Sequence, residues 1–245
     1  MGLLNNVKTF SNWYCIYLTR YGLLRRRFVF KTKRHERFLV RPWTDDVRIV
    51  KSVFAKNNYE NEFTSVAPGS VVVDVGANIG AFTVLAARRA KKVIAYEPEP
   101  ENFELLCINI ELNNLGNVVP LRKAIAREKG ARPFHTAEGK DSSSHSFYLQ
   151  QPGKTLVVET LSVADVIKQE SLTKVDFLKL DCEGAEFEIL QNLSPDTAEK
   201  IEQIALEVHQ KDGLSADDLS KRLSTLGFDV RMGKAPGYIY ARRKK

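Results

Sequence analysis

Apolar residues recur with a helical period at the start of the chain. They lie three or four residues apart, at Leu3, Val7, Phe10, Tyr14, Tyr17, Tyr21 and Leu24. This spacing predicts one amphipathic helix, or two, over the first 24 residues. The apolar face of such a helix must be covered by the rest of the chain, by a second subunit or by a membrane surface.

The next apolar positions follow a shorter period, which indicates strands. Apolar and polar residues alternate between Phe28 and Val40, so we expect two short strands that end before Pro42. Thr44 is suited to be the N-cap of a helix that runs through about Tyr59. Residues 1–60 are therefore expected to form a small cap region with helices and a hairpin.

After residue 60 the chain alternates between strand-like and helix-like segments. The expected strands are 71–75, 92–96, 118–126, 175–180, 201–208 and 228–231, and the expected helices are 80–90, 99–114, 184–192 and 215–226. This order is typical of a parallel sheet, with residues 130–160 interpreted as strand fragments and an inserted loop. A last strand at 237–241 follows its predecessor too closely for a crossover helix, so it must be antiparallel. Residues 61–245 are thus expected to form one α/β domain with a Rossmann-like, mostly parallel seven-stranded sheet.

The turn after the first of these strands is suited to a ligand. Glycine in Gly76-Ala-Asn-Ile-Gly80 permits a tight turn and a close approach to the backbone. The spacing differs from the Gly-x-Gly-x-x-Gly turn that places a pyrophosphate at a helix N-terminus. Glu97 lies 23 residues after Asp74, at the end of the next strand, where a carboxylate can accept both hydroxyls of a ribose. The pattern indicates a nucleoside cofactor without a pyrophosphate, with NAD as the alternative.

S-adenosylmethionine meets these requirements, because it has a ribose, a sulfonium and a zwitterionic methionine end. Asp74 can hold the amino group, directly or through water, and Glu97 can hold the ribose. The backbone amides of the loop can serve the carboxylate. The expected cofactor-binding residues therefore also include Gly76, Ala77, Asn78 and Gly80.

Four stretches of the sequence form recognisable motifs. They are Val-Asp-Val-Gly-Ala-Asn-Ile-Gly (73–80), Tyr-Glu-Pro-Glu-Pro-Glu-Asn-Phe (96–103), Asn-Ile-Glu-Leu-Asn-Asn (109–114) and Phe-Leu-Lys-Leu-Asp-Cys-Glu-Gly-Ala-Glu (177–186). In order and spacing, over roughly residues 60–210, they resemble the FkbM family of methyltransferases. The resemblance implies a class I methyltransferase fold and S-adenosyl-L-methionine as cofactor. It also implies methylation of a hydroxyl oxygen on a sugar, glycolipid or natural-product acceptor.

Two strand ends bring polar groups to the edge of the sheet where ligands bind. One delivers Asp181 and Glu183, and the next delivers Glu207 and His209. His209 is a candidate base because the ordinary pKa of histidine lies near neutrality, although it could simply bond to the backbone. Asp181 and Glu183 could orient the acceptor, act as base or bind the amino end of the cofactor, or they could cap the following helix. We take Asp181, Glu183 and His209 as the candidate catalytic residues, with Asp181 also a candidate for cofactor binding.

The same four side chains could form a shell for a divalent metal. Asp181, Glu183, Glu207 and His209 offer oxygen and nitrogen ligands. Their spacing is not diagnostic, so no metal is predicted. Lys179, two residues before Asp181, is expected to pair with a neighbouring carboxylate.

The net charge of +7 is concentrated at the two ends of the chain. Residues 1–50 carry a net +8 and residues 231–245 a net +6, whereas residues 51–230 carry −7. Basic ends attract anions such as membrane headgroups, phosphorylated substrates or nucleic acid, and solvated termini are the alternative.

The basic ends leave two other functions open. The first is an RNA methyltransferase, but the sequence has no RRM-type or OB-type signature, so nucleic acid is the less favoured partner. The second is a membrane-associated binding protein anchored by residues 1–27. No run reaches the roughly 18 apolar residues of a membrane span. We therefore expect a cytoplasmic enzyme with a hydroxylated small-molecule, glycan or lipid-linked acceptor, and peripheral membrane contact and homo-oligomers remain hypotheses.

Overall fold

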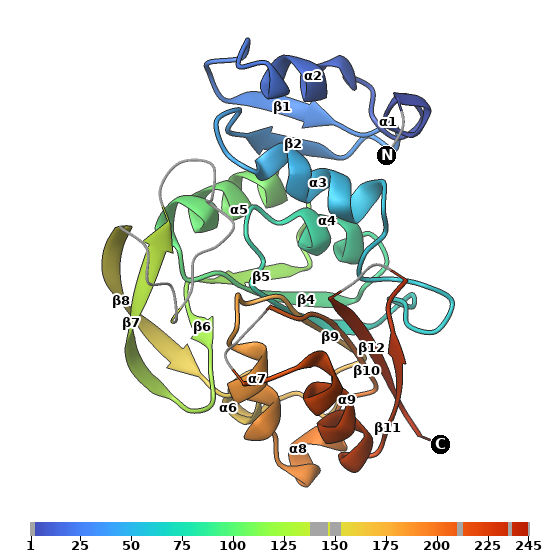
Figure 1. Ribbon diagram of the computed structural model, residues 1–245, viewed down its shortest axis with the longest axis vertical. Helices are drawn as coiled ribbons and strands as arrows, with labels where there is room; N and C mark the ends of the chain where they lie inside the picture. Colours follow the sequence, from blue (N-terminus) through green and yellow to red (C-terminus); the bar gives the residue numbers. More distant parts are fainter. Residues whose placement is uncertain (1–2, 138–146, 148–152, 210–212, 235–236, 245) are drawn as a thin grey trace.

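A seven-stranded sheet forms the centre of the protein (Figure 1). The computed structural model describes residues 3–137, 147, 153–209, 213–234 and 237–244. In spatial order the strands are β11 (Phe228–Met232), β12 (Tyr238–Arg243), β10 (Gln203–Glu207), β9 (Phe177–Leu180), β3 (Val71–Val75), β4 (Lys92–Tyr96) and β5 (Val118–Leu121). β12 runs antiparallel to both of its neighbours, and the other pairs are parallel. The expected Rossmann-like sheet with an antiparallel last strand is confirmed.

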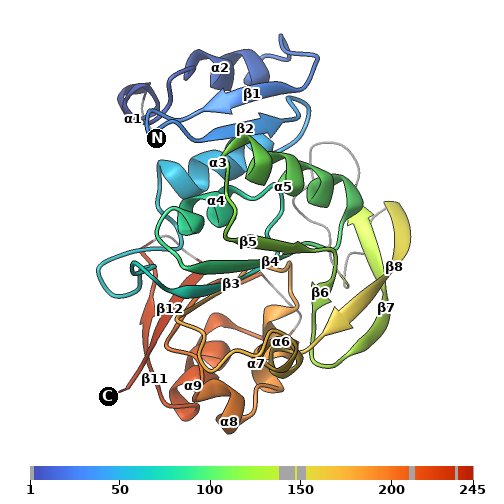
Figure 2. The ribbon, with the colours of Figure 1, turned by 180° about the vertical axis from the view of Figure 1, so that it is seen from behind.

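Helices cover both faces of this sheet (Figures 1 and 2). One face carries α3 (Asp46–Phe54), α4 (Ala81–Ala87) and α5 (Pro100–Leu112), and the other carries α6 (Val163–Gln169), α7 (Glu186–Gln191), α8 (Pro195–Ala198) and α9 (Ala216–Thr225). Successive residues of a strand point to opposite faces, so Val72 and Val73 of β3 belong to two different hydrophobic clusters. Because helices cover both faces of the sheet, the side chains on both faces of the central strands are buried, and these strands are apolar almost throughout.

The predicted strand 118–126 is wrong as a single element. β5 ends at Leu121, and the chain then forms β6 (Ala124–Ile125) in a separate sheet with β8 (Gly153–Leu161) and β7 (Gly130–Ala137). Residues 130–160, predicted as strand fragments, therefore contain two long paired strands. Helix α6 was not predicted, although Ser162 and Asp165 form a capping box at its start.

The N-terminal cap forms a layer over α3 (Figure 1). It consists of α1 (Leu3–Thr9), α2 (Tyr14–Arg20) and the antiparallel strands β1 (Phe28–Lys31) and β2 (Arg37–Val40), so the apolar stretch forms two helices. Phe10 is fully buried and stacks on Phe30 with 4.6 Å between ring centroids. Both rings belong to the same hydrophobic cluster as Val72 and Phe82, so the core of the cap is continuous with that of the sheet domain.

Hydrogen bonds from α5 also fasten the cap to the domain. Asn109 Oδ1 accepts from the backbone N–H of Leu39 at 2.6 Å, and Asn113 Oδ1 accepts from that of Arg37 at 3.0 Å. These asparagines belong to one of the recognised motifs, and here they satisfy the free edge of β2. Among the described residues, no helix has the length and apolar character needed to cross a membrane.

The helix predicted through about Tyr59 is shorter than expected. α3 ends at Phe54, and Tyr59 follows in a turn. Its ring is 5% exposed and packs edge-on against Phe82 with 5.4 Å between centroids. The early end of α3 thus brings the Tyr59 hydroxyl to the carboxyl end of the sheet.

Candidate active site

A cavity of about 340 Å³ opens at the carboxyl ends of β3, β4, β9 and β10. Residues of α3, of the loop after β3 and of β12 complete its wall. Phe134 and Phe147 give one side of it an apolar surface. This is the edge of a wound sheet where ligands bind.

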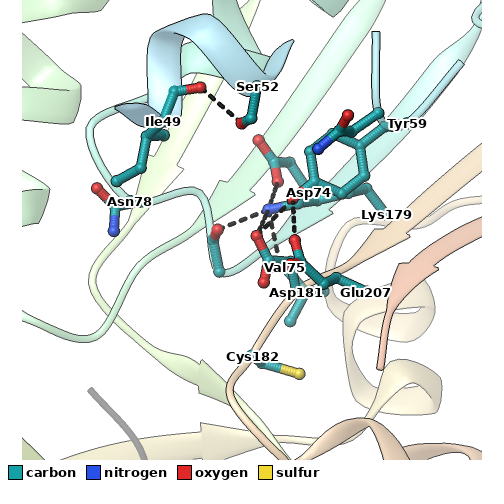
Figure 3. A network of polar contacts seen from close by, with 12 residues as sticks. Ile49, Ser52, Tyr59, Asp74, Val75, Asn78, Lys179, Asp181, Cys182 and Glu207 are labelled. Atoms are coloured by element: carbon teal, nitrogen blue, oxygen red, sulfur yellow. Dashed lines mark hydrogen bonds and ion pairs between the residues drawn. The ribbon is translucent and has the colours of Figure 1, made fainter. Parts of the chain in front are cut away.

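A buried ion pair lies beneath the loop that follows β3 (Figure 3). Lys179 Nζ is 3.1 Å from Asp74 Oδ1 and donates to the Gly76 carbonyl at 2.6 Å. Thr83 Oγ1 donates to Asp74 Oδ2 at 2.6 Å. Asp74 is therefore fully buried and does not line the cavity. Its expected role in holding the amino group of the cofactor, directly or through water, stays a prediction. Lys179 pairs with a carboxylate as predicted, and the pair holds the loop in place.

The glycine loop is fixed by hydrogen bonds within the protein. The N–H groups of Gly76 and Ala77 both donate to the Tyr96 carbonyl, at 3.0 and 2.9 Å, and that of Gly80 donates to the Ala77 carbonyl at 2.9 Å. These amides were expected to bind the carboxylate of the cofactor. They already donate to backbone carbonyls of the protein, because β3 and β4 end side by side. Gly76, Ala77 and Asn78 line the cavity, whereas Gly80 lies behind its wall.

The two glycines are needed for packing within the protein. Gly76 has a φ of 72°, and a Cβ there would lie 1.8 Å from the backbone oxygen of Asp181. Gly80 has a φ of 87°, and a Cβ there would lie 2.7 Å from Leu106 Cδ1. A ligand was expected to approach the backbone closely at these glycines. In the structure the end of β9 approaches Gly76, and α5 approaches Gly80.

Glu97 reaches the cavity from the end of β4, as expected. Its carboxylate accepts from the backbone N–H of Asn78 at 2.8 Å and from that of Glu99 at 2.9 Å. The residue is 5% exposed. Burial raises the pKa of Glu97 to about 7, against the opposing effect of these hydrogen bonds.

His209 is oriented by a carboxylate from the start of α7. Its Nδ1 lies 3.0 Å from Glu186 Oε1, and its Nε2 lies 3.4 Å from Glu183 Oε2 and 3.7 Å from Asp181 Oδ1. Burial lowers the pKa of His209, but the bond to Glu186 and the charges of Glu186, Glu183 and Asp181 outweigh it and raise the pKa to about 10. The imidazole therefore holds a proton at neutral pH. Side-chain contacts, not the backbone, fix its position.

Glu183 lines the cavity and does not cap α7, which has no side-chain cap. The N-cap residue of α7 is Ala185, and it is Glu186 that accepts from the N–H groups of Cys182 and Gly184, at 2.7 and 2.8 Å. Glu183 adopts a left-handed φ of 51°. Burial raises the pKa of Glu183 to about 8, and the positive charge of His209 opposes this rise.

Asp181 lies at the centre of the charged groups. It accepts from the Tyr59 hydroxyl at 2.6 Å, and its Oδ2 is 3.6 Å from Lys179 Nζ. Burial alone would raise the pKa of Asp181, but the positive charges of Lys179 and His209 keep it below its ordinary value. Asp181 is thus the ionised acid at the end of β9.

A second network, only partly anticipated from the sequence, continues from Tyr59 along the cavity wall. Glu207 accepts from the Tyr238 hydroxyl at 2.6 Å and from the Tyr59 hydroxyl at 3.2 Å (Figure 3 shows Tyr59 and Glu207). Asn58 Nδ2 donates to the Tyr238 hydroxyl at 2.7 Å. Tyr59 and Tyr238 come from opposite ends of the chain, so no local motif could reveal them. The Tyr-Ile-Tyr pattern of the last strand was the one signal in the sequence.

The His209 cluster also meets a distance criterion for metal binding. Among the described residues, ligand atoms of Asp181, Glu186 and His209 lie within 4.8 Å of one another. Both carboxylate oxygens of Glu186 already accept backbone N–H groups, however, and one also contacts His209. The oxygens of this carboxylate are thus already hydrogen-bonded within the protein, which leaves less capacity to bind a metal ion.

The cavity fits S-adenosylmethionine. Glu97 offers carboxylate oxygens for ribose hydroxyls, and the ionised Asp181 lies across the loop from it. The wall carries the carboxyl groups of Glu97, Asp181, Glu183 and Glu207 against the cations of Lys179 and His209. Such an acidic surrounding suits a ligand with a positively charged sulfonium.

Comparison with known proteins gives a family match. Residues 74–230 match the family model described as the methyltransferase FkbM domain. The hexuronic acid methyltransferase AglP of Haloferax volcanii is 27% identical, over 67% of this chain and 65% of AglP. The 31-O-demethyl-FK506 methyltransferase FkbM of Streptomyces tacrolimicus is 25% identical, over 67% of this chain and 75% of that protein.

A solved structure has the same fold. The methyltransferase FkbM from Methylobacillus flagellatus KT superposes with a TM-score of 0.51 at 16% sequence identity. The superposition covers 73% of this chain but 44% of that one. At this identity the likeness is one of fold.

Proposed function

We propose, from the premise that this chain belongs to the FkbM family of methyltransferases, that it methylates a hydroxyl oxygen of a sugar, glycolipid or other natural product. Its cofactor is S-adenosylmethionine. The observation that carries oxygen methylation is the array of Glu183, His209 and Glu186, which sets a proton acceptor at the cavity wall. The names of two relatives, a hexuronic acid methyltransferase and a 31-O-demethyl-FK506 methyltransferase, support this acceptor class.

The cofactor would be held mainly by acids at the strand ends. When bound, it supplies an electrophilic methyl group on its sulfonium. We assign its ribose to Glu97 and its cationic part to Asp181. Gly76, Ala77 and Asn78 would contact it along the cavity wall. Asp74 and Gly80 would act indirectly, by keeping the loop in position.

Glu183 is the proposed proton acceptor. As the acceptor oxygen takes the methyl group, whose bond to the sulfonium sulfur breaks and leaves a neutral thioether, the hydroxyl proton would pass to the Glu183 carboxylate. A pKa of about 8 matches this task near neutral pH. His209 keeps its own proton near neutral pH because its pKa is about 10. We therefore propose that it acts as a fixed cation beside Glu183 and Asp181, and not as the base expected from the sequence. Positioning of the acceptor should supply most of the rate.

The wall formed by the chain ends would bind the acceptor. Tyr59, Glu207 and Tyr238 form a chain of hydroxyl and carboxylate groups at the cavity. Such groups recognise hydroxyl-rich molecules by hydrogen bonding. In this arrangement residues 1–60 contribute Tyr59 to the acceptor side of the cavity, and residues 61–245 hold the cofactor and contribute Glu207 and Tyr238.

The experiment is methyl transfer from isotopically labelled S-adenosylmethionine to glycan, glycolipid and RNA fractions, followed by mass spectrometry. We expect labelled O-methyl groups in a glycan or glycolipid fraction. Glu183→Gln should retain cofactor binding by calorimetry but lose transfer by at least about 100-fold. Label in RNA alone would favour the nucleic-acid function. A folded protein that does not bind the cofactor would refute the assignment of the cavity.

A further inference from the structure

The outer part of the cap exposes a concentration of apolar side chains. Eight large apolar residues are exposed in the described part of the chain, and five of them lie in α1, α2 and the turn after α2: Leu3, Leu4, Tyr14, Tyr21 and Leu23. Leu4, Tyr21 and Leu23 are 76%, 72% and 67% exposed. Apolar side chains gathered in this way indicate a contact with a partner.

The charges carried by this segment of the chain have a single sign, and Glu104 of α5 lies 3.6 Å from Arg27 at its end. Residues 1–35 contain eight lysines and arginines and no aspartate or glutamate. Arg20, Arg25 and Arg26 are exposed and flank Tyr21 and Leu23 in the sequence. Within the described residues, no ion pair is found for these three arginines. The segment therefore presents unneutralised cations beside apolar groups.

This combination selects among the possible partners. A second copy of the chain would bring the same positive charges face to face, which is repulsive. Nucleic acid would neutralise the arginines but would leave the leucines in water. An anionic bilayer satisfies both, because phosphates meet the arginines and the acyl boundary accepts leucine and tyrosine side chains.

We propose that the exposed side chains of residues 3–27, here called the docking surface, bind the surface of an anionic phospholipid bilayer. Leu4, Tyr21 and Leu23 enter the boundary between headgroups and acyl chains, and Arg20, Arg25 and Arg26 contact lipid phosphates. The contact is peripheral, because α1 and α2 have seven residues each and are far too short to span a membrane.

α3 connects the docking surface to the cavity. Asn5 Nδ2 of α1 donates to the carbonyl of Ala55, the C-cap residue of α3, at 3.2 Å. Lys56, the next residue, lines the cavity, together with Ile49 and Ser52 of α3. If the proposed function holds, a bound bilayer would thus present a lipid-linked acceptor beside the cavity.

The test is sedimentation with vesicles, which needs no activity. The full chain should bind phosphatidylcholine vesicles that contain phosphatidylglycerol and should bind pure phosphatidylcholine weakly, with binding that falls as salt rises. Arg25→Glu with Arg26→Glu should weaken binding by roughly 25-fold or more, because each lost cation costs about five-fold. Leu23→Ser should weaken it by about tenfold.

Matched controls use exposed residues elsewhere. Lys91→Glu with Arg242→Glu changes the net charge equally, and Val157→Ser removes a side chain that is 78% exposed. These variants should bind like the unaltered chain. Point variants are preferable to removal of the segment, because Phe10 and Cys15 within it are buried in the core.

Three results with vesicles would overturn the proposal. They are equal binding to neutral and anionic vesicles, unchanged binding by the Arg25 and Arg26 double variant, and absence of vesicle binding together with self-association that Leu23→Ser abolishes. The last result would assign the surface to a second copy of the chain. RNA retention that competes fully with vesicles and depends on the arginines but not on Leu23 would likewise refute a lipid contact. Each outcome is independent of whether methyl transfer is observed.

Discussion

Glu186 lies behind the cavity, yet it controls a residue that faces it. The side chain is fully buried, and it holds the turn after β9 through two backbone N–H groups while contacting His209 Nδ1. This bond turns Nε2 of His209 toward Asp181 and Glu183. Partners of this kind fix ring orientation and protonation in many active sites.

Glu186→Gln is therefore expected to act as a positioning variant. Loss of the carboxylate charge should lower the pKa of His209 from about 10 and reduce methyl transfer by about 10- to 100-fold, with little change in cofactor affinity. The imidazole pKa can be followed by NMR titration. The exposed Glu199→Gln is the control. An unchanged imidazole titration in the folded variant would contradict the role of Glu186.

Glu97 should make cofactor binding depend on pH. Its carboxylate must be ionised to accept two ribose hydroxyls, and burial raises its pKa to about 7. Affinity should therefore fall as the pH drops below about 7, by up to tenfold for each pH unit. Calorimetry across this range measures the effect. Glu97→Gln should bind more weakly and show a flat profile; the same slope in this variant would point to another group.

The protonation of Glu183 should appear in the pH–rate profile. The proposed acceptor must be ionised, so the rate should rise with pH through about 8. The proton on His209 must be kept, so the rate should fall again near its pKa of about 10. A rate that already levels off far below pH 8 in saturating substrate would exclude Glu183 as the proton acceptor.

Residues that directly follow a strand are predictable from the sequence. Glu97, Asp181, Glu183 and His209 all reach the cavity as predicted, because parallel strands end at one edge of the sheet. Asp74, within a strand, was expected to hold the cofactor, but it is fully buried and does not line the cavity. Its neighbour Thr83 comes from the next helix, whereas its neighbour Lys179 is set by strand order, which the local sequence does not encode.

At the level of elements, the loop after β3 and the end of β9 are in close contact. The loop after β3 passes so close to the end of β9 that only a glycine fits at position 76. The two strands are adjacent in the sheet but about 100 residues apart in the chain, as the Asp74 and Lys179 register shows. Their contact brings the loop and Asp181 together.

Gly76→Ala should destabilise the protein markedly. The positive φ alone should cost about 1–3 kcal/mol, and the clash with the Asp181 carbonyl adds to this cost. Denaturant unfolding measures the loss. Gly116→Ala is the matched control, since a Cβ at Gly116 meets nothing within 4 Å among the described residues. Equal stability of the two variants would contradict the proposed packing.

The succession of strands and helices was predictable because buried strands and amphipathic helices have distinct periods. The break between β5 and β6 was not predictable in this way. Residues 118–126 have the composition of one strand, and the chain leaves the sheet because residues 124–125 pair with β8, which comes much later. Pairing between distant segments decides such breaks.

At the level of the whole molecule, the cap and the sheet domain share one hydrophobic cluster. They should therefore unfold together. Both tryptophans of the chain, Trp13 and Trp43, lie in the cap, so their fluorescence reports on the cap while circular dichroism reports on the whole fold. The two transitions should coincide in denaturant.

Phe10→Ala should lower the stability of both parts. The side chain is fully buried against Phe30, so its removal should cost about 3–5 kcal/mol and shift the fluorescence and dichroism transitions equally. Leu4→Ala, at an exposed position of α1, should change little. A variant whose cap melts first while the sheet domain remains folded would show that the two parts are independent.

The meeting of Tyr59 and Tyr238 across Glu207 has a consequence for how such enzymes diverge. Both tyrosines lie outside residues 74–230, the region that matches the family, whereas Glu97, Asp181, Glu183 and His209 lie inside it. If the proposed roles hold, substitutions near the two tyrosines would change which molecule is modified and would leave the residues proposed for methyl transfer intact. Relatives could then differ in acceptor through changes in two short segments.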